Sequence, residues 1–140
     1  MSKGSFEKIR NSDRRLYGPR KLLLTGFAAG VQTNFKTVLQ KLGFSDVALV
    51  WATEDQLETI IDDLVQLPDG SGNGRTSSLP RAVIVGGITE KELQSLISGC
   101  RKAGMKQALW ATLTPTSVTW RLQQLLSELA AEHAALSRKK

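Results

Sequence analysis

The feature of this sequence that most restricts its fold is a set of four short, almost continuously apolar runs. They read RKLLLTGF (20–27), VALVWAT (47–53), RAVIVGG (81–87) and QALWATLT (107–114). Runs of this length without polar–apolar alternation are typical of strands that are buried on both faces. Strands of that kind occur mainly in parallel sheets that helices cover on both sides.

Each run is followed by a segment whose apolar residues recur at helical spacing. These residues are Val31, Phe35, Val38, Leu39 and Leu42 after the first run, Leu57, Ile60, Ile61 and Leu64 after the second, Leu93, Leu96, Ile97 and Cys100 after the third, and Val118, Leu122, Leu125, Leu126 and Leu129 after the fourth. The spacing places each set on one helical face. Thr53 with Gln56, and Thr89 with Glu92, have the pattern of a capping box and predict two of the helix starts. The chain therefore alternates strand and helix four times.

This order predicts an α/β fold, a single small three-layer domain with a four-stranded, mainly parallel sheet and helices on both faces. Strand order 2-1-3-4 is favoured because right-handed crossovers restrict the topology, and no hairpin supports a ferredoxin-like arrangement. A long C-terminal helix is expected from about Pro115 to Arg138, with Thr114 as its N-cap. The predicted domain covers residues 20–140 and has a flexible Gly/Ser-rich loop at 68–80, and residues 1–19 form a basic N-terminal extension.

The two halves of the chain resemble each other. Residues 20–44 align without gaps with residues 81–105, at an offset of 61 positions. The identical pairs are Arg20 and Arg81, Gly26 and Gly87, Lys41 and Lys102, and Gly43 and Gly104. The Trp-Ala-Thr triplet also occurs in both halves, and its two copies align if the second half is taken to be two residues shorter. A duplication and the ordinary periodicity of α/β folds both account for this pattern.

Composition excludes several classes of function. Among 140 residues there are one cysteine and one histidine, so an internal disulfide, a multi-cysteine metal site and a two-histidine metal site are impossible. No apolar run approaches the roughly 20 residues that span a bilayer, and the N-terminus lacks the apolar region of a secretory signal. We expect no membrane contact and a cytoplasmic location. No motif places a nucleophile near His133, so we assign no catalytic residue, metal or cofactor.

Polar and glycine residues after the strands predict a ligand crevice. In open α/β sheets ligands bind beyond the C-terminal strand ends, where the strand order reverses, which is between the first and third strands. The crevice candidates are Thr25, Gly26, Gly86, Gly87, Thr89, Thr112, Thr114 and Trp120. In a parallel arrangement Thr25 and Gly26 would face Gly86 and Gly87. Alternatively, the glycines only allow tight turns and the hydroxyls satisfy backbone groups.

Several basic residues are expected on the opposite edge of the sheet. The chain carries a formal net charge of +6, and the candidates for contact with a nucleic-acid backbone are Arg20, Lys21, Arg81, Arg101, Lys102 and Lys106. A one-sided basic face is typical of phosphate contact. Cations at helix C-termini also stabilise the helix dipole and need no partner.

The C-terminal third, LWATLTPTSVTWRLQQLLSELAAEH, resembles the end of a small bacterial family catalogued as domain of unknown function 3783. The resemblance depends on Thr114-Pro115, Trp120, Leu125-Leu126, Glu128-Leu129 and Glu132-His133, and covers roughly residues 81–134. It implies a bacterial cytosolic origin and a helix at the C-terminal end. It implies no catalytic residue, because the family has no established activity.

The sequence thus favours a non-enzymatic interaction or regulatory module. We expect it to form a homodimer through the C-terminal helix or to bind an unidentified protein. Where that helix is longer than the sheet it covers, its leucine stripe needs a partner. Two alternatives remain, which are nucleic-acid binding through the basic residues and small-ligand or nucleotide binding at the crevice.

Overall fold

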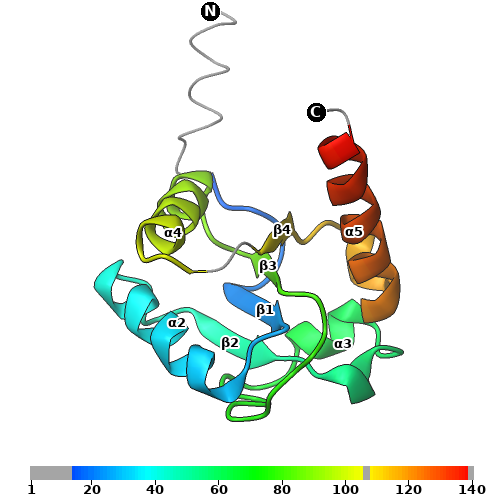
Figure 1. The fold of residues 1–140 in the computed structure, drawn as a ribbon, viewed down its shortest axis with the longest axis horizontal. Helices are drawn as coiled ribbons and strands as arrows, with labels where there is room; N and C mark the ends of the chain where they lie inside the picture. Colours follow the sequence, from blue (N-terminus) through cyan, green and yellow to red (C-terminus); the bar gives the residue numbers. More distant parts are fainter. Residues whose placement is uncertain (1–13, 106–107, 139–140) are drawn as a thin grey trace, which may run out of the picture.

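The computed structural model describes residues 14–105 and 108–138, and its arrangement is shown in Figure 1. The strands are β1 (Lys21–Thr25), β2 (Ala48–Trp51), β3 (Ala82–Gly86) and β4 (Leu109–Thr112). The α-helices are α2 (Ala29–Lys41), α3 (Ile61–Val65), α4 (Glu90–Lys102) and α5 (Leu122–Arg138), and short 3₁₀ helices cover Glu54–Gln56 and Ser117–Thr119. The strand–helix alternation predicted from the sequence is confirmed.

The strands form one sheet in the order β2-β1-β3-β4, as predicted. The outer pairs, β1 with β2 and β3 with β4, are parallel, whereas the central pair, β1 with β3, is antiparallel. The predicted α/β fold with a mainly parallel sheet is therefore confirmed, and the central pairing makes the sheet a mixed one.

Helices cover both faces of the sheet and bury two separate hydrophobic cores. Helices α2 and α4 lie on one face, and α3 and α5 lie on the other (Figure 1). Successive side chains of a strand point to opposite faces, so Leu22 and Leu24 enter the first core while Leu23 enters the second. This two-sided burial explains why the strands read as continuous apolar runs.

The two halves of the fold are related by an approximate two-fold axis. Each residue corresponds to the one 61 positions later, since Lys21 pairs with Ala48 and Ala82 pairs with Leu109 in the same register. The axis passes between Leu23 and Ile84, which lie directly opposite each other in the antiparallel pair. Under this correspondence Trp51 matches Thr112 and not Trp110, so the repeated Trp-Ala-Thr triplets are two residues out of register.

The correspondence continues on the second face of the sheet. Ile61 N donates to Trp120 O at 2.8 Å, and 61 positions later Leu122 N donates to Thr59 O at 2.9 Å. Ile60 and Arg121, which also correspond, form an antiparallel bridge. The starts of α3 and α5 therefore meet at the same axis, although α3 has 5 residues and α5 has 17.

The chain between α3 and β3 explains why the central pair is antiparallel. Lys21 Nζ, at the start of β1, donates to the carbonyl oxygens of Val65 and Leu67 at 2.6 and 2.7 Å. From there the chain runs parallel to β2, with Ser71 bridged to Val50. It thereby reaches the other end of the sheet, where Thr25 Oγ1 donates to Pro80 O at 2.7 Å. β3 must then run back beside β1 in the opposite direction.

Side chains fasten the predicted loop at 68–80 to the domain. The buried Gln32 donates through Nε2 to Arg75 O at 2.9 Å and accepts through Oε1 from Gly74 N at 2.8 Å. Ser77, also buried, accepts from Gly26 N at 3.2 Å. The flexibility of this loop stays a prediction, as does the division at residue 19. Residues 1–13 of the predicted extension lie outside the described residues.

Two predicted helices begin later than expected. The helix expected after Pro115 starts at Leu122, because Thr114 and Ser117 bond to each other's backbone N–H at 2.9 and 3.0 Å and form a separate turn. Hydroxyl side chains compete with helical hydrogen bonds in this way. The helix expected after Thr53 is split into a 3₁₀ helix and α3. The Thr89–Glu92 capping box at the start of α4 is confirmed.

The turn at Gly26 allows a substitution test of the central pairing. Gly26 has φ +76°, and an added Cβ would lie 2.4 Å from Leu79 O and 2.6 Å from the Arg81 backbone. Gly43 has φ +86° and open space around it. We expect Gly43→Ala to cost about 1–2 kcal/mol of unfolding free energy through left-handed strain alone, and Gly26→Ala to cost about 1–3 kcal/mol more through overpacking. Urea denaturation measures both values, and equal losses would contradict the close approach.

Candidate functional site

The antiparallel central pair separates the residues of the predicted crevice. Thr25 lies opposite Ala82 and Gly86 lies opposite Lys21, so the glycine turns after β1 and β3 are at opposite ends of the sheet. The prediction that Thr25-Gly26 faces Gly86-Gly87 across one crevice is wrong, because that placement requires parallel strands.

The hydroxyl and indole groups of the crevice set serve the fold. Thr25 donates to Pro80 O, Thr89 accepts from Glu92 N, and Thr114 accepts from Ser117 N. Trp120 packs against the second core. Thr112 differs from these residues because it lies on the outermost strand, β4, and is half-buried there.

The predicted basic residues do not form one face. Arg20 and Lys21 lie at the start of β1, whereas Arg81 precedes β3 at the other end of the sheet. Lys21 is engaged by the carbonyls after α3. Arg101 and Lys102 are exposed at the end of α4, and Lys106 lies outside the described residues.

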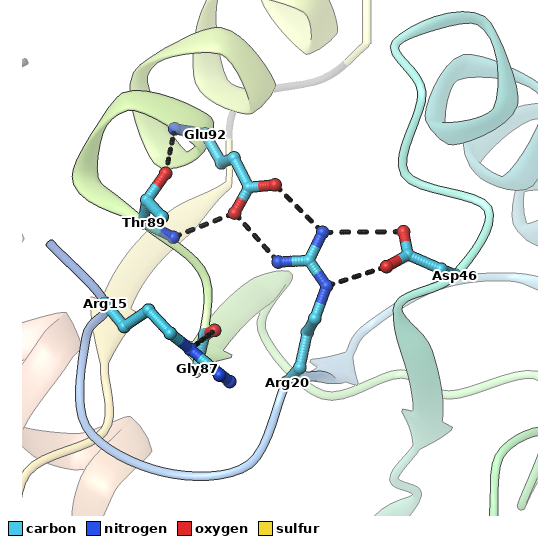
Figure 2. A network of polar contacts seen from close by, with 6 residues as sticks. All are labelled: Arg15, Arg20, Asp46, Gly87, Thr89 and Glu92. Carbon is cyan, nitrogen blue, oxygen red and sulfur yellow. Dashed lines mark hydrogen bonds and ion pairs between the residues drawn. The ribbon is translucent and has the colours of Figure 1, made fainter. Parts of the chain in front are cut away.

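Arg20 is the centre of a polar network, shown in Figure 2. Its Nη1 and Nη2 atoms each donate to a carboxylate oxygen of Glu92 at 2.8 Å, and its Nε donates to Asp46 Oδ2 at 2.9 Å. Glu92 Oε1 also accepts from Thr89 N at 2.9 Å. This network ties the start of β1 to the start of α4 and to the turn before β2. Sequence reasoning found the Thr89–Glu92 pair and named Arg20 as a candidate for nucleic-acid contact, but it missed the pairing of Arg20 with Glu92, which is 72 positions away.

The network shifts the protonation equilibria of its members. Hydrogen bonds from Arg20, against the cost of partial burial, lower the pKa of Glu92 to about 2. The same bonds raise the pKa of Arg20 above its ordinary value, and the Arg20 bond lowers the pKa of Asp46. All three groups stay ionised at neutral pH, so the Arg20 guanidinium has both carboxylates as permanent counter-ions.

The outer edge of β2 is closed by the chain that follows α3. Leu49 N donates to Asp69 Oδ1, Gly70 N donates to Leu49 O, and Trp51 N donates to Ser71 O, each at 2.8 Å. These bonds satisfy the backbone groups of β2 that point away from β1. An exposed strand edge would otherwise be free to pair with another chain.

The outer edge of β4 has no such cover among residues 14–105 and 108–138. Leu109 N and Leu113 N donate inward to β3, so by strand alternation Trp110 and Thr112 present their N–H and C=O groups outward. These two residues correspond to Leu49 and Trp51 in the first half. Residues 69–71, which cover β2, correspond to residues 130–132, which are part of helix α5. The longer helix therefore leaves the second edge open.

Two cavities lie along the open edge, one at each end of β4. One of about 380 Å³ at the start of β4 is lined by Pro80, Arg81, Ala108, Leu109, Ala130 and His133. Another of about 360 Å³ at its end is lined by Leu93, Trp110, Ala111, Thr112, Leu129 and Glu132. In Figure 1 the last turns of α5 extend past the β4 edge of the sheet. We take the open edge, defined as the outward side of residues 109–112 with these two cavities, as the candidate functional site.

A further cavity of about 300 Å³ lies in the first half, between α2 and β2. The buried residue Trp51 lines it, and the indole N–H of Trp51 has no hydrogen-bond partner among the described residues. The covering residues Asp69, Gly70 and Asn73 form part of its wall.

Comparison with known proteins gives one family match, and it lies in the second half of the chain. The model of the family described as Domain of unknown function (DUF3783) matches residues 81–136. The resemblance inferred from the sequence is thus confirmed for this C-terminal part, which contains β3, α4, β4 and nearly all of α5. No curated protein matches the chain, and no solved structure does.

Two further observations concern site chemistry. None of the described helices is both long and apolar enough to cross a membrane. Within residues 14–105 and 108–138, no three histidine, cysteine, aspartate or glutamate side chains are grouped so that they could hold a metal ion.

The Arg20 network predicts a specific acid sensitivity. Because the pKa of Glu92 is about 2 in the folded state and 4.5 for an ordinary glutamate, its contribution to stability is present above pH 4.5 and is lost as the pH falls towards 2. We expect Glu92→Gln to cost about 1–2 kcal/mol at pH 7 and the difference from wild type to shrink below pH 4. Glu58→Gln, which affects an exposed ion pair, is the matched control. Thermal unfolding between pH 2 and 7 tests this, and a pH-independent difference would contradict it.

Proposed function

We propose that this protein is a non-enzymatic interaction module that forms a homodimer by pairing β4 with β4 of a second copy. The open outer edge of β4 carries this proposal, because the corresponding edge of β2 is closed by hydrogen bonds to residues 69–71. Unpaired strand edges are common sites of association between chains. The proposal also retains a bacterial origin and a cytoplasmic location, both of which stay predictions.

The edge is self-complementary about Ala111. In an antiparallel pair with a two-fold axis at Ala111, Trp110 lies opposite Thr112 of the second copy, and these residues exchange both outward hydrogen bonds. The two Ala111 residues then form the close, non-hydrogen-bonded pair, which their small side chains allow. The result is one continuous sheet of eight strands, four from each copy.

Helix α5 supports a second copy as the occupant of the edge. Beyond the half-buried Leu129, its residues Ala130, Ala131 and Ala134 are exposed, and the last turns of the helix extend past β4 (Figure 1). Small side chains let helices approach closely. A two-fold axis at Ala111 brings the two projecting helices together on the same face of the joined sheet. Both the edge and the expected role of the C-terminal helix are then parts of one interface.

The register of this interface can be tested by cross-linking. Directly opposed Cα atoms in a non-hydrogen-bonded antiparallel pair are about 4.5 Å apart, within the range that a disulfide bridges. We expect Ala111→Cys to form a covalent dimer under mild oxidation. Ser127→Cys, an exposed position on α5, and the wild-type chain with its buried Cys100 should stay uncross-linked. Non-reducing mass analysis measures the yield, and equal yields at positions 111 and 127 would contradict the register.

A proline substitution tests the edge without changing its charge. Thr112→Pro removes one outward N–H group and leaves the bonds from β4 to β3, since proline is tolerated on an edge strand where its nitrogen faces outward. We expect the dissociation constant of the dimer to rise at least tenfold in sedimentation equilibrium, with little change in the far-ultraviolet circular dichroism. The control is Gln124→Lys, a substitution at an exposed position of α5. A proline at position 124 would break the helix and is therefore not a suitable control. A wild-type monomer at millimolar concentration, or a dimer unaffected by Thr112→Pro, would overturn the proposal.

A further inference from the structure

We propose that Arg81 binds the carboxylate of a small aliphatic monocarboxylate whose tail enters the cavity between α4 and strands β3 and β4. This ligand site shares Arg81 and Trp110 with the walls of the open-edge cavities, but it does not depend on the dimer proposed above. It uses the side chain of Arg81 and a cavity on the α2–α4 face of the sheet, and it needs no second copy of the chain.

The internal two-fold axis supplies the first argument. Arg81 corresponds to Arg20, whose guanidinium is neutralised by Glu92 and Asp46. Applying the same correspondence to these two carboxylates gives Val31 in place of Glu92, and Gln107 in place of Asp46. In this correspondence the sequence has an uncharged residue type at each position where the Arg20 network has a carboxylate. Figure 2 shows the arrangement of the two carboxylates around Arg20.

Arg81 is held in place but has no counter-ion within the described part of the chain. Its guanidinium carbon lies 4.7 Å from the ring centroid of Phe27, a cation–π contact that restrains the side chain. The ion pairs of the described residues involve Arg20, Arg75 and Arg121, but not Arg81. The residue is half-buried. A partly desolvated guanidinium without a carboxylate favours binding of an anion.

A cavity beside Arg81 determines the rest of the ligand. It has a volume of about 170 Å³, and its apolar wall includes Phe35, Val83, Ile97, Cys100, Met105 and Trp110. Arg81 and the exposed Arg101 also line it. At roughly 30 Å³ for a group of the size of water, the cavity holds about six such groups. An anion with a short unbranched apolar tail, such as hexanoate, matches both the charge and the volume.

The Arg20 network indicates a carboxylate as the head group. There the guanidinium takes both oxygens of Glu92 at 2.8 Å, the planar two-bond geometry that arginine favours with carboxylates. Arg81 presents the same group at the corresponding place. The carboxylate oxygens of the ligand accept hydrogen bonds from the Nη atoms of Arg81. The tail supplies the van der Waals contacts that the walls of an empty apolar cavity lack.

Titration of the full-length protein with hexanoate, followed by amide chemical shifts, tests this proposal. We expect saturable shifts at Val83, Ile97 and Trp110, and binding at least tenfold weaker for acetate, which lacks the tail, and for hexanol, which lacks the charge. Arg81→Gln should weaken hexanoate binding at least tenfold, while Lys102→Gln, an exposed neighbouring cation, should leave it unchanged. Hexyl phosphate distinguishes the head groups, and binding tighter than that of hexanoate would overturn the assignment of a carboxylate.

A second variant separates the cavity from the charge. Ala108→Leu adds side-chain volume at the cavity wall and leaves Arg81 intact. We expect it to remove the preference for hexanoate over acetate, with an unchanged unfolding midpoint as the check on folding. The proposal is overturned if hexanoate gives no saturable shifts below 10 mM, a concentration that corresponds to a binding free energy of about 2.7 kcal/mol. It is also overturned if the Arg81→Gln variant binds hexanoate as tightly as the wild type does. Repeating the titration with Thr112→Pro shows whether this site is independent of the dimer, as we expect.

Discussion

The antiparallel pairing of β1 with β3 is the constraint on which the rest of this structure depends. It joins two parallel β-α-β units back to back, with Leu23 opposite Ile84 at the centre. The arrangement of the two halves relative to each other follows from this contact. It gives the two halves the same register, places α2 and α4 on one face and brings the starts of α3 and α5 together on the other. It also separates the turns at Gly26 and Gly87, each of which approaches the backbone of the opposing half.

The differences between the two halves are more informative than their likeness. The same strand edge is closed in the first half, where residues 69–71 run along β2, and open in the second, where the chain stays helical. Arg20 is neutralised by two carboxylates in the first half, whereas the corresponding Arg81 forms no ion pair within the described part of the chain. Both candidate sites therefore lie in the second half. That half is also the part of the chain matched by the model of a family of unknown function.

Some of the fold could be predicted from the sequence because the relevant signals are local. Continuous apolar runs located the four strands, and the Thr89–Glu92 box located the start of α4. The start of α5 was missed because the Thr114 and Ser117 hydroxyls bond to backbone groups more favourably than the helix would. The crevice was predicted wrongly because the direction of β3 depends on the path of the chain from residue 66 to residue 81. That path is decided by contacts of residues 69–80 with β1, β2 and Gln32.

The sequence by itself determined the alternation of strands and helices, the burial of the sheet on both faces and the strand order. The alternation and the two-sided burial follow from periodicity, which is a property of neighbouring residues, and the strand order was favoured because right-handed crossovers restrict the topology. Only the tertiary structure decided which charged groups lack an ion-pair partner and which backbone groups lack a hydrogen bond. Arg20 and Arg81 are the same residue in the same pattern, and they differ only because Glu92, 72 positions from Arg20, reaches one guanidinium and no described carboxylate reaches the other. Charge neutralisation and edge closure depend on contacts between distant segments, which short-range sequence patterns do not record.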